Sequence, residues 1–143
     1  MEIKNNESTE LRPEGARLLD APLVSIDIAE FINQIKSETT WQTSDRNAIT
    51  VFKTDGMRIV LIAMHKNAIL KEHSTDGIIS VQVLEGEINF STNTQSKFLG
   101  KNDMIALHEG LPHSIEAVKE SVFLLTLTNP PTGKSVKQKN STV

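Results

Sequence analysis

The sequence predicts an all-β sandwich or barrel preceded by one α-helix, and three observations lead to that prediction. From about residue 45 onward, short segments rich in β-branched and apolar residues recur every ~8–12 residues. Turn signals such as Asp55-Gly56 and Asn102-Asp103 separate them. No helical periodicity lies between these segments, which argues against a parallel α/β sheet. The length of 143 residues fits a single domain.

Composition excludes several classes of function. The chain has no cysteine, so disulfide scaffolds and cysteine-based zinc, iron–sulfur or thiol chemistry are ruled out. A formal net charge of −3 supplies no basic field for nucleic acid or for an anionic membrane. The first residues lack the apolar stretch of a signal peptide, and the longest strongly apolar run, 59–64, is too short to span a bilayer. We therefore expect a cytoplasmic protein without nucleic-acid or membrane partners.

The first 44 residues divide into two parts. Residues 1–20 form a polar arm, either flexible or able to pair as a strand with another chain. Residues 21–44 carry a helix at about 27–37, because Asp27 is a good N-cap and Glu30 follows three residues later. One apolar stripe recurs at helical spacing: Ile28, Phe31, Ile32 and Ile35. The stripe indicates packing against the domain or against a partner subunit.

Residues 45–128 are expected to form the barrel, and the polar residues 129–143 a disordered tail. The predicted strands are 48–52, 57–65, 78–84, 87–91, 104–107, 114–118 and 122–127. Strand 57–65 is apolar on both faces, one of which carries Leu61, Ala63 and His65, so we expect both faces to be covered. The barrel interior would take one face, and the helix or a second subunit the other. This pattern is the first indication of a homodimer.

The histidines carry a resemblance to a known family. His73, His108 and His113 each lie beside a turn signal, and Val83-Leu84-Glu85-Gly86-Glu87 closes a strand. Here the chain resembles the cupin superfamily, whose fold is a double-stranded β-helix of jelly-roll type. Gly86 matches the last glycine of the family's first motif and His73 its first metal-binding histidine. In the second motif, His113 matches the histidine and Gly110 the glycine before it, while His108 falls on the motif's proline.

The chain also departs from the two motifs. The leading glycines fall on Asn67 and Asn102, and asparagine tolerates the left-handed conformation best after glycine, so the fold is unaffected. The second metal-binding histidine falls on Thr75 and the glutamate on Ile79. These two changes remove two of the four ligands that the resemblance implies, since threonine is a poor ligand for transition metals and isoleucine is none.

The favoured function is a small cupin that binds or senses a small organic molecule, with weak or absent divalent-metal binding. A ligand would contact the side chains of His73, Thr75, Ile79, Val81 and His113. His73 and His113 would also be the metal ligands, with a third from His108 or His65, holding Zn, Fe, Ni, Mn or Cu at low occupancy.

Three alternatives remain open at this stage. The first is a metal-dependent enzyme, an oxygenase or isomerase acting on a small acid or sugar through His73 and His113. The second is metal-free acid–base catalysis by one of these histidines with Glu72, Glu109 or Asp76. The third is a protein-interaction module that uses the helix stripe and the tail. The residues alone do not decide whether the protein is an enzyme.

Overall fold

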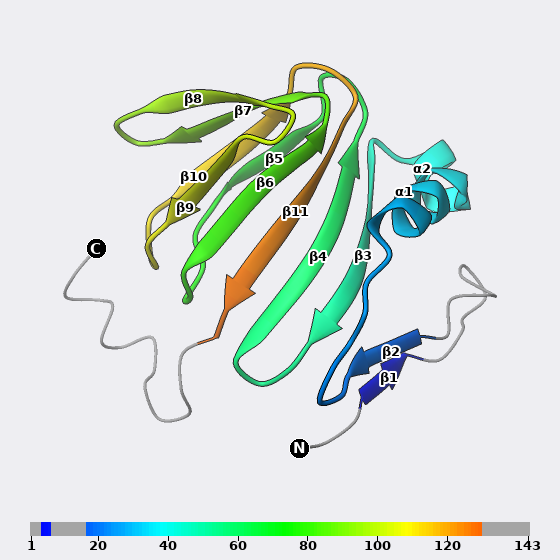
Figure 1. Ribbon diagram of the computed structural model, residues 1–143. Helices are drawn as coiled ribbons and strands as arrows, with labels where there is room; N and C mark the ends of the chain where they lie inside the picture. Colours follow the sequence, from blue (N-terminus) through cyan, green and yellow to red (C-terminus); the bar gives the residue numbers. More distant parts are fainter. Residues whose placement is uncertain (1–3, 7–16, 130–143) are drawn as a thin grey trace.

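The computed structural model describes residues 4–6 and 17–129, and in them the fold is an antiparallel β-sandwich with two helices on one side (Figure 1). A five-stranded sheet has the order β3-β4-β11-β6-β9, and a four-stranded sheet the order β5-β10-β7-β8. The first consists of β3 Arg46–Lys53, β4 Met57–Met64, β11 Ser121–Thr128, β6 Ile79–Glu85 and β9 Met104–Leu107. The second consists of β5 Ile69–His73, β10 His113–Ala117, β7 Glu87–Thr92 and β8 Ser96–Gly100.

The predicted helix is confirmed. Helix α1 spans Ile28–Ser37, and the Asp27 carboxylate accepts a hydrogen bond from the backbone N–H of Glu30 at 3.1 Å. A short second helix, α2, spans Thr39–Thr43 and was not predicted, because five residues with three threonines carry no helical period. Its Trp41 is buried against the same cluster as Ile35 of α1.

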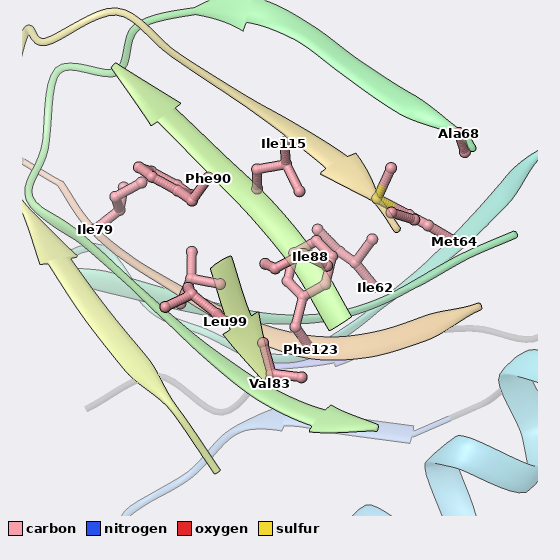
Figure 2. Close-up of a cluster of buried hydrophobic side chains, with 12 residues drawn as sticks. Ile62, Met64, Ala68, Ile79, Val83, Ile88, Phe90, Leu99, Ile115 and Phe123 are labelled. Carbon is pink, nitrogen blue, oxygen red and sulfur yellow. The ribbon is translucent and has the colours of Figure 1, made fainter. Parts of the chain in front are cut away.

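Two apolar clusters lie on opposite faces of the five-stranded sheet. The inner cluster fills the space between the two sheets and includes Ile62, Met64 and Phe123 (Figure 2). The outer cluster lies between the helices and the sheet and includes Leu61 and Ala63. Alternate residues of β4 thus enter different clusters, which confirms that both faces of this strand are covered. The helices cover the outer face where a second subunit was the other expectation.

The turns confirm the interpretation of the motif glycines. Asn67 and Asn102 have φ of 75° and 73°, so both adopt the left-handed conformation that the matching glycines would adopt. Gly86 has φ of 85°, and a Cβ atom there would collide with the carbonyl oxygen of Glu120. These positions hold the strand connections of the barrel.

Strands β5 and β8 were not predicted from the sequence. Most side chains of β5 are exposed, and β8 carries an exposed Phe98 beside lysine and serine, so neither segment shows a clean alternation of apolar and polar residues. Pairing with β10 and β7 recruits them into the second sheet. Backbone pairing, rather than side-chain pattern, thus defines these two strands.

The predicted arm, 1–20, contains two short strands. β1 Lys4–Asn6 and β2 Arg17–Asp20 pair with each other, and the Arg17 Nε donates to the Thr50 carbonyl on β3 at 2.7 Å. The remainder of the arm and all but residue 129 of the predicted tail lie outside the described residues. Within the described residues, no helix is long and apolar enough to cross a membrane.

Candidate functional site

A β-bulge on β5 brings two of the predicted site residues together. In the pairing of β5 with β10, Leu70 lies opposite Ile115 and His73 lies opposite His113. Three steps along β5 therefore match two steps along β10, which is the count of a β-bulge. Leu70 packs against the inner cluster, and without the extra residue His73 would point away from it. The bulge places His73 on the same face as His113.

The two imidazole rings lie against each other. Their centroids are 4.4 Å apart with an interplanar angle of 56°. The ring of His113 also stacks on Phe90 at 5.5 Å, and Phe90 belongs to the inner cluster. The His73/His113 pair thus lies at one end of the space between the sheets, with an apolar wall beneath it.

Backbone carbonyls define the tautomer of both rings. The Nδ1 of His73 lies 3.0 Å from the Lys71 carbonyl oxygen, and that of His113 lies 2.9 Å from the Leu111 carbonyl oxygen. A carbonyl oxygen only accepts, so each neutral ring carries its proton on Nδ1. Each Nε2 then presents a lone pair, and neither has a hydrogen-bond partner among the described residues. This arrangement suits metal coordination and also acceptance of a proton or hydrogen bond from a ligand.

The two histidines differ in exposure. His113 is only 3 % exposed, whereas His73 is exposed to solvent. Burial lowers the pKa of His113 below its ordinary value of 6.5, and His73 lowers it further, although the hydrogen bond with Leu111 acts in the opposite direction. His113 is therefore neutral at pH 7 and is available as a base or as a ligand.

The other predicted ligand-contacting residues have structural partners. The Thr75 hydroxyl donates to the Gly77 carbonyl at 3.0 Å, which places it within the turn between β5 and β6. Ile79 and Val81 are buried in the inner cluster. Figure 2 shows Ile79 and Phe90 among the buried side chains of the inner cluster. Ile79 and Val81 therefore contribute apolar side chains to the space between the sheets.

Neither of the two further histidines joins the pair. The His65 ring stacks on Trp41 with centroids 3.5 Å apart, and its Nε2 lies 2.8 Å from the Trp41 carbonyl oxygen. His65 therefore lies against Trp41 of the outer cluster, on the opposite face of the five-stranded sheet from the inner cluster. The side chain of His108 is 83 % exposed and pairs with Glu109 at 3.2 Å. No group of three or more histidine, aspartate or glutamate side chains that could hold a metal occurs within residues 4–6 and 17–129.

Sequence reasoning missed two contributors to the site. Phe90 was placed on a predicted strand, but nothing in its neighbourhood indicated that it would stack on His113. The Leu111 carbonyl, which orients His113, follows from a turn geometry that the sequence does not reveal. The only local signal was the alternation of Ile88 and Phe90 on the inner face of β7.

Solved structures share this fold. A cupin-2 domain protein from Shewanella frigidimarina matches with a TM-score of 0.60 and 13% identity, covering 73% of this chain and 94% of that one. A cupin superfamily protein from Desulfitobacterium hafniense matches with a TM-score of 0.58 and 16% identity, covering 59% and 78%. An RmlC-like cupin from Desulfovibrio desulfuricans matches with a TM-score of 0.54 and 22% identity, covering 58% and 81%.

The chain is thus a small cupin-fold domain, as the motifs predicted, with the two sheets forming a jelly-roll barrel. No family model matches the sequence, and no curated protein matches it either. The similarity is therefore one of fold, and the function has to be argued from the side chains.

Proposed function

We propose that this protein binds a small organic molecule at the end of the barrel, where the ligand contacts His73 and His113. The observation that carries the proposal is the orientation of the two rings. Both Nδ1 atoms face backbone carbonyls, so both Nε2 atoms remain for a ligand. The ring of His113 stacks on Phe90 of the inner cluster, and a few polar groups beside apolar side chains are typical of small-molecule sites.

Metal binding at this pair is proposed to be weak. Two imidazoles are fewer than the three protein ligands usual in catalytic zinc sites. The positions that the motifs assign to further ligands hold Thr75, whose hydroxyl donates within a turn, and Ile79, which is in the core. A bound Zn, Fe, Ni, Mn or Cu ion would therefore keep several water or ligand positions and exchange readily.

A metal-dependent enzyme is the second candidate, and one observation favours it. Histidines that ligate metals usually donate their other ring N–H to a carbonyl or carboxylate, as both rings do here. Open positions on such a metal could take an oxygen-containing substrate. The homodimer expected from the sequence stays a prediction.

The test compares the wild-type chain with the variants His73→Ala and His108→Ala. His108 is the matched control, because it is an exposed histidine outside the pair. Each protein is titrated with Ni²⁺ and Zn²⁺ by calorimetry and screened by thermal shift against small organic acids, amides and sugars. We expect compounds that raise the Tm of the wild type and of His108→Ala but not of His73→Ala. Equal binding by His73→Ala, or no binding of any metal or compound, would refute the proposal.

A further inference from the structure

Two cations lie opposite each other on the inner face of the five-stranded sheet. Arg58 pairs with Lys53 across β3 and β4. The register of β4 with β11 has no irregularity, so Arg58 lies on the same face as Val60, Ile62 and Met64, which contact the inner cluster. Like charges directly opposite each other destabilise a strand pair, so this arrangement calls for a compensating anion.

Arg58 differs from the other arginines that the structure describes. Arg17 donates to the Thr50 carbonyl, and Arg46 pairs with Asp45 and donates to the Ile69 carbonyl. The half-buried Arg58 makes no side-chain hydrogen bond or ion pair with any described residue, and neither does Lys53. A guanidinium offers five donors in a planar fork that matches a carboxylate, so Arg58 has unused capacity for one.

The strand register connects Arg58 to the histidine pair. One row across the sheet runs from Arg58 through Leu127 and Ile79 to Leu107. Ile79 begins β6, six residues after His73, and Leu107 ends β9, six residues before His113. The loop after His73 and the loop before His113 contact each other, because the Gly110 N–H donates to the Thr75 carbonyl at 2.8 Å. Arg58 and the His73/His113 pair therefore lie at the same end of the barrel.

The surface between them is apolar. Leu125, Leu127, Ile105 and Leu107 are only partly buried, although they contact the inner cluster. At ~4.8 Å per strand, the backbones of Arg58 and Ile79 lie about 10 Å apart across the sheet, and the arginine side chain can span part of this distance. The row itself contains no carboxylate.

We propose that the ligand of this site is a small organic carboxylate with an apolar body. Its carboxylate binds Arg58 in the field of Lys53, its body packs on Leu125 and Leu127, and its far end meets the Nε2 atoms of His73 and His113. This inference rests on the proposed function and adds to it the chemical class of the ligand. Because the two ends of the site bind different parts of the ligand, Arg58 can be tested separately from the histidines.

The experiment uses the full chain and a panel of probes with a hydroxyl at the end remote from the carboxylate: 4-hydroxybutanoate, 6-hydroxyhexanoate, 4-hydroxybenzoate and 4-hydroxyphenylacetate, each beside its uncharged primary amide. Binding is followed by amide chemical shifts in NMR titrations of the wild type, Arg58→Gln and the control Arg46→Gln. We expect at least one acid to shift the signals of β4 and β11 saturably and its amide to bind at least about tenfold more weakly. Arg58→Gln should weaken the acid by a similar factor, and Arg46→Gln should leave it unchanged.

Several results would overturn the inference. If the amides bind as tightly as their acids, or if an acid binds Arg58→Gln as tightly as the wild type, Arg58 does not bind a carboxylate. Ligand binding that still depends on His73 would in that case leave the proposed function intact. If none of the acids binds, the carboxylate inference fails. A lower Tm of unliganded Arg58→Gln than of the wild type would show that the guanidinium already has a partner within the chain, which also refutes the inference. We expect its Tm to be unchanged or higher, since the substitution removes the repulsion with Lys53.

Discussion

Truncating His113 should lower the stability of the fold, whereas truncating His73 should abolish binding and leave the stability nearly unchanged. His113→Ala removes a buried ring that stacks on Phe90, and it leaves the Leu111 carbonyl without its donor. The lost hydrogen bond and the cavity together should cost about 3 kcal/mol, or about 10 °C in Tm. His73→Ala removes an exposed ring, and the carbonyl that this ring contacts belongs to Lys71, which is also exposed. The substitution should therefore lower the free energy of unfolding by less than about 1 kcal/mol.

The assay pairs urea unfolding at pH 7.5 with a Ni²⁺ or ligand titration of each variant. A functional His73 predicts a variant with near-wild-type stability that no longer binds. A structural His73 predicts a loss of stability comparable to that of His113→Ala. Finding the two variants equally destabilised would therefore refute the reasoning, because it would mean that His73 is as well packed as His113.

Three further predictions concern pH and the turns. Burial lowers the pKa of His113, so as the pH falls the unfolded chain takes up this proton at a higher pH than the folded chain does. The free energy of unfolding should therefore fall as the pH drops below about 6.5. Urea unfolding from pH 8 to pH 5 should show a smaller fall in His113→Ala than in the wild type. Gly86→Ala should cost at least about 3 kcal/mol in the same assay, because the added Cβ would collide with the Glu120 carbonyl at a residue with positive φ. Gly56→Ala should stay within about 1 kcal/mol of the wild type, because no atom lies near the added Cβ. Similar costs for the two variants would contradict this prediction. Asn102→Ala should cost about 1 kcal/mol and Asn102→Gly nothing, as measured by thermal unfolding.

The sequence was most informative where side-chain alternation or backbone conformation decides the structure. The two faces of β4 followed from a period of two, and that same alternation already separated His65 from Ile62 and Met64. Had this been applied to the search for a third ligand, His65 would not have been a candidate. Asn67 and Asn102 were likewise explained by the left-handed conformation alone.

The sequence was least informative where long-range backbone pairing decides the structure. The bulge that turns His73 inward depends on how β5 meets β10, residues that lie about forty positions apart, and no local signal marks it. Strand β8 similarly exists because it pairs with β7. The row that joins Arg58 to Ile79 and Leu107 is a property of strand register, which only the assembled sheet reveals.

The two departures from the family's ligand pattern have structural roles in this chain. The Thr75 hydroxyl supports the turn by donating to Gly77, and Ile79 fills the inner cluster. Restoring a glutamate at 79 would therefore bury a charge in the core instead of simply completing a metal site. The end of this barrel combines two imidazoles, the apolar inner cluster and an arginine without a described partner. We propose that this combination binds an organic anion; the two histidines are fewer than the three protein ligands usual in a catalytic zinc site.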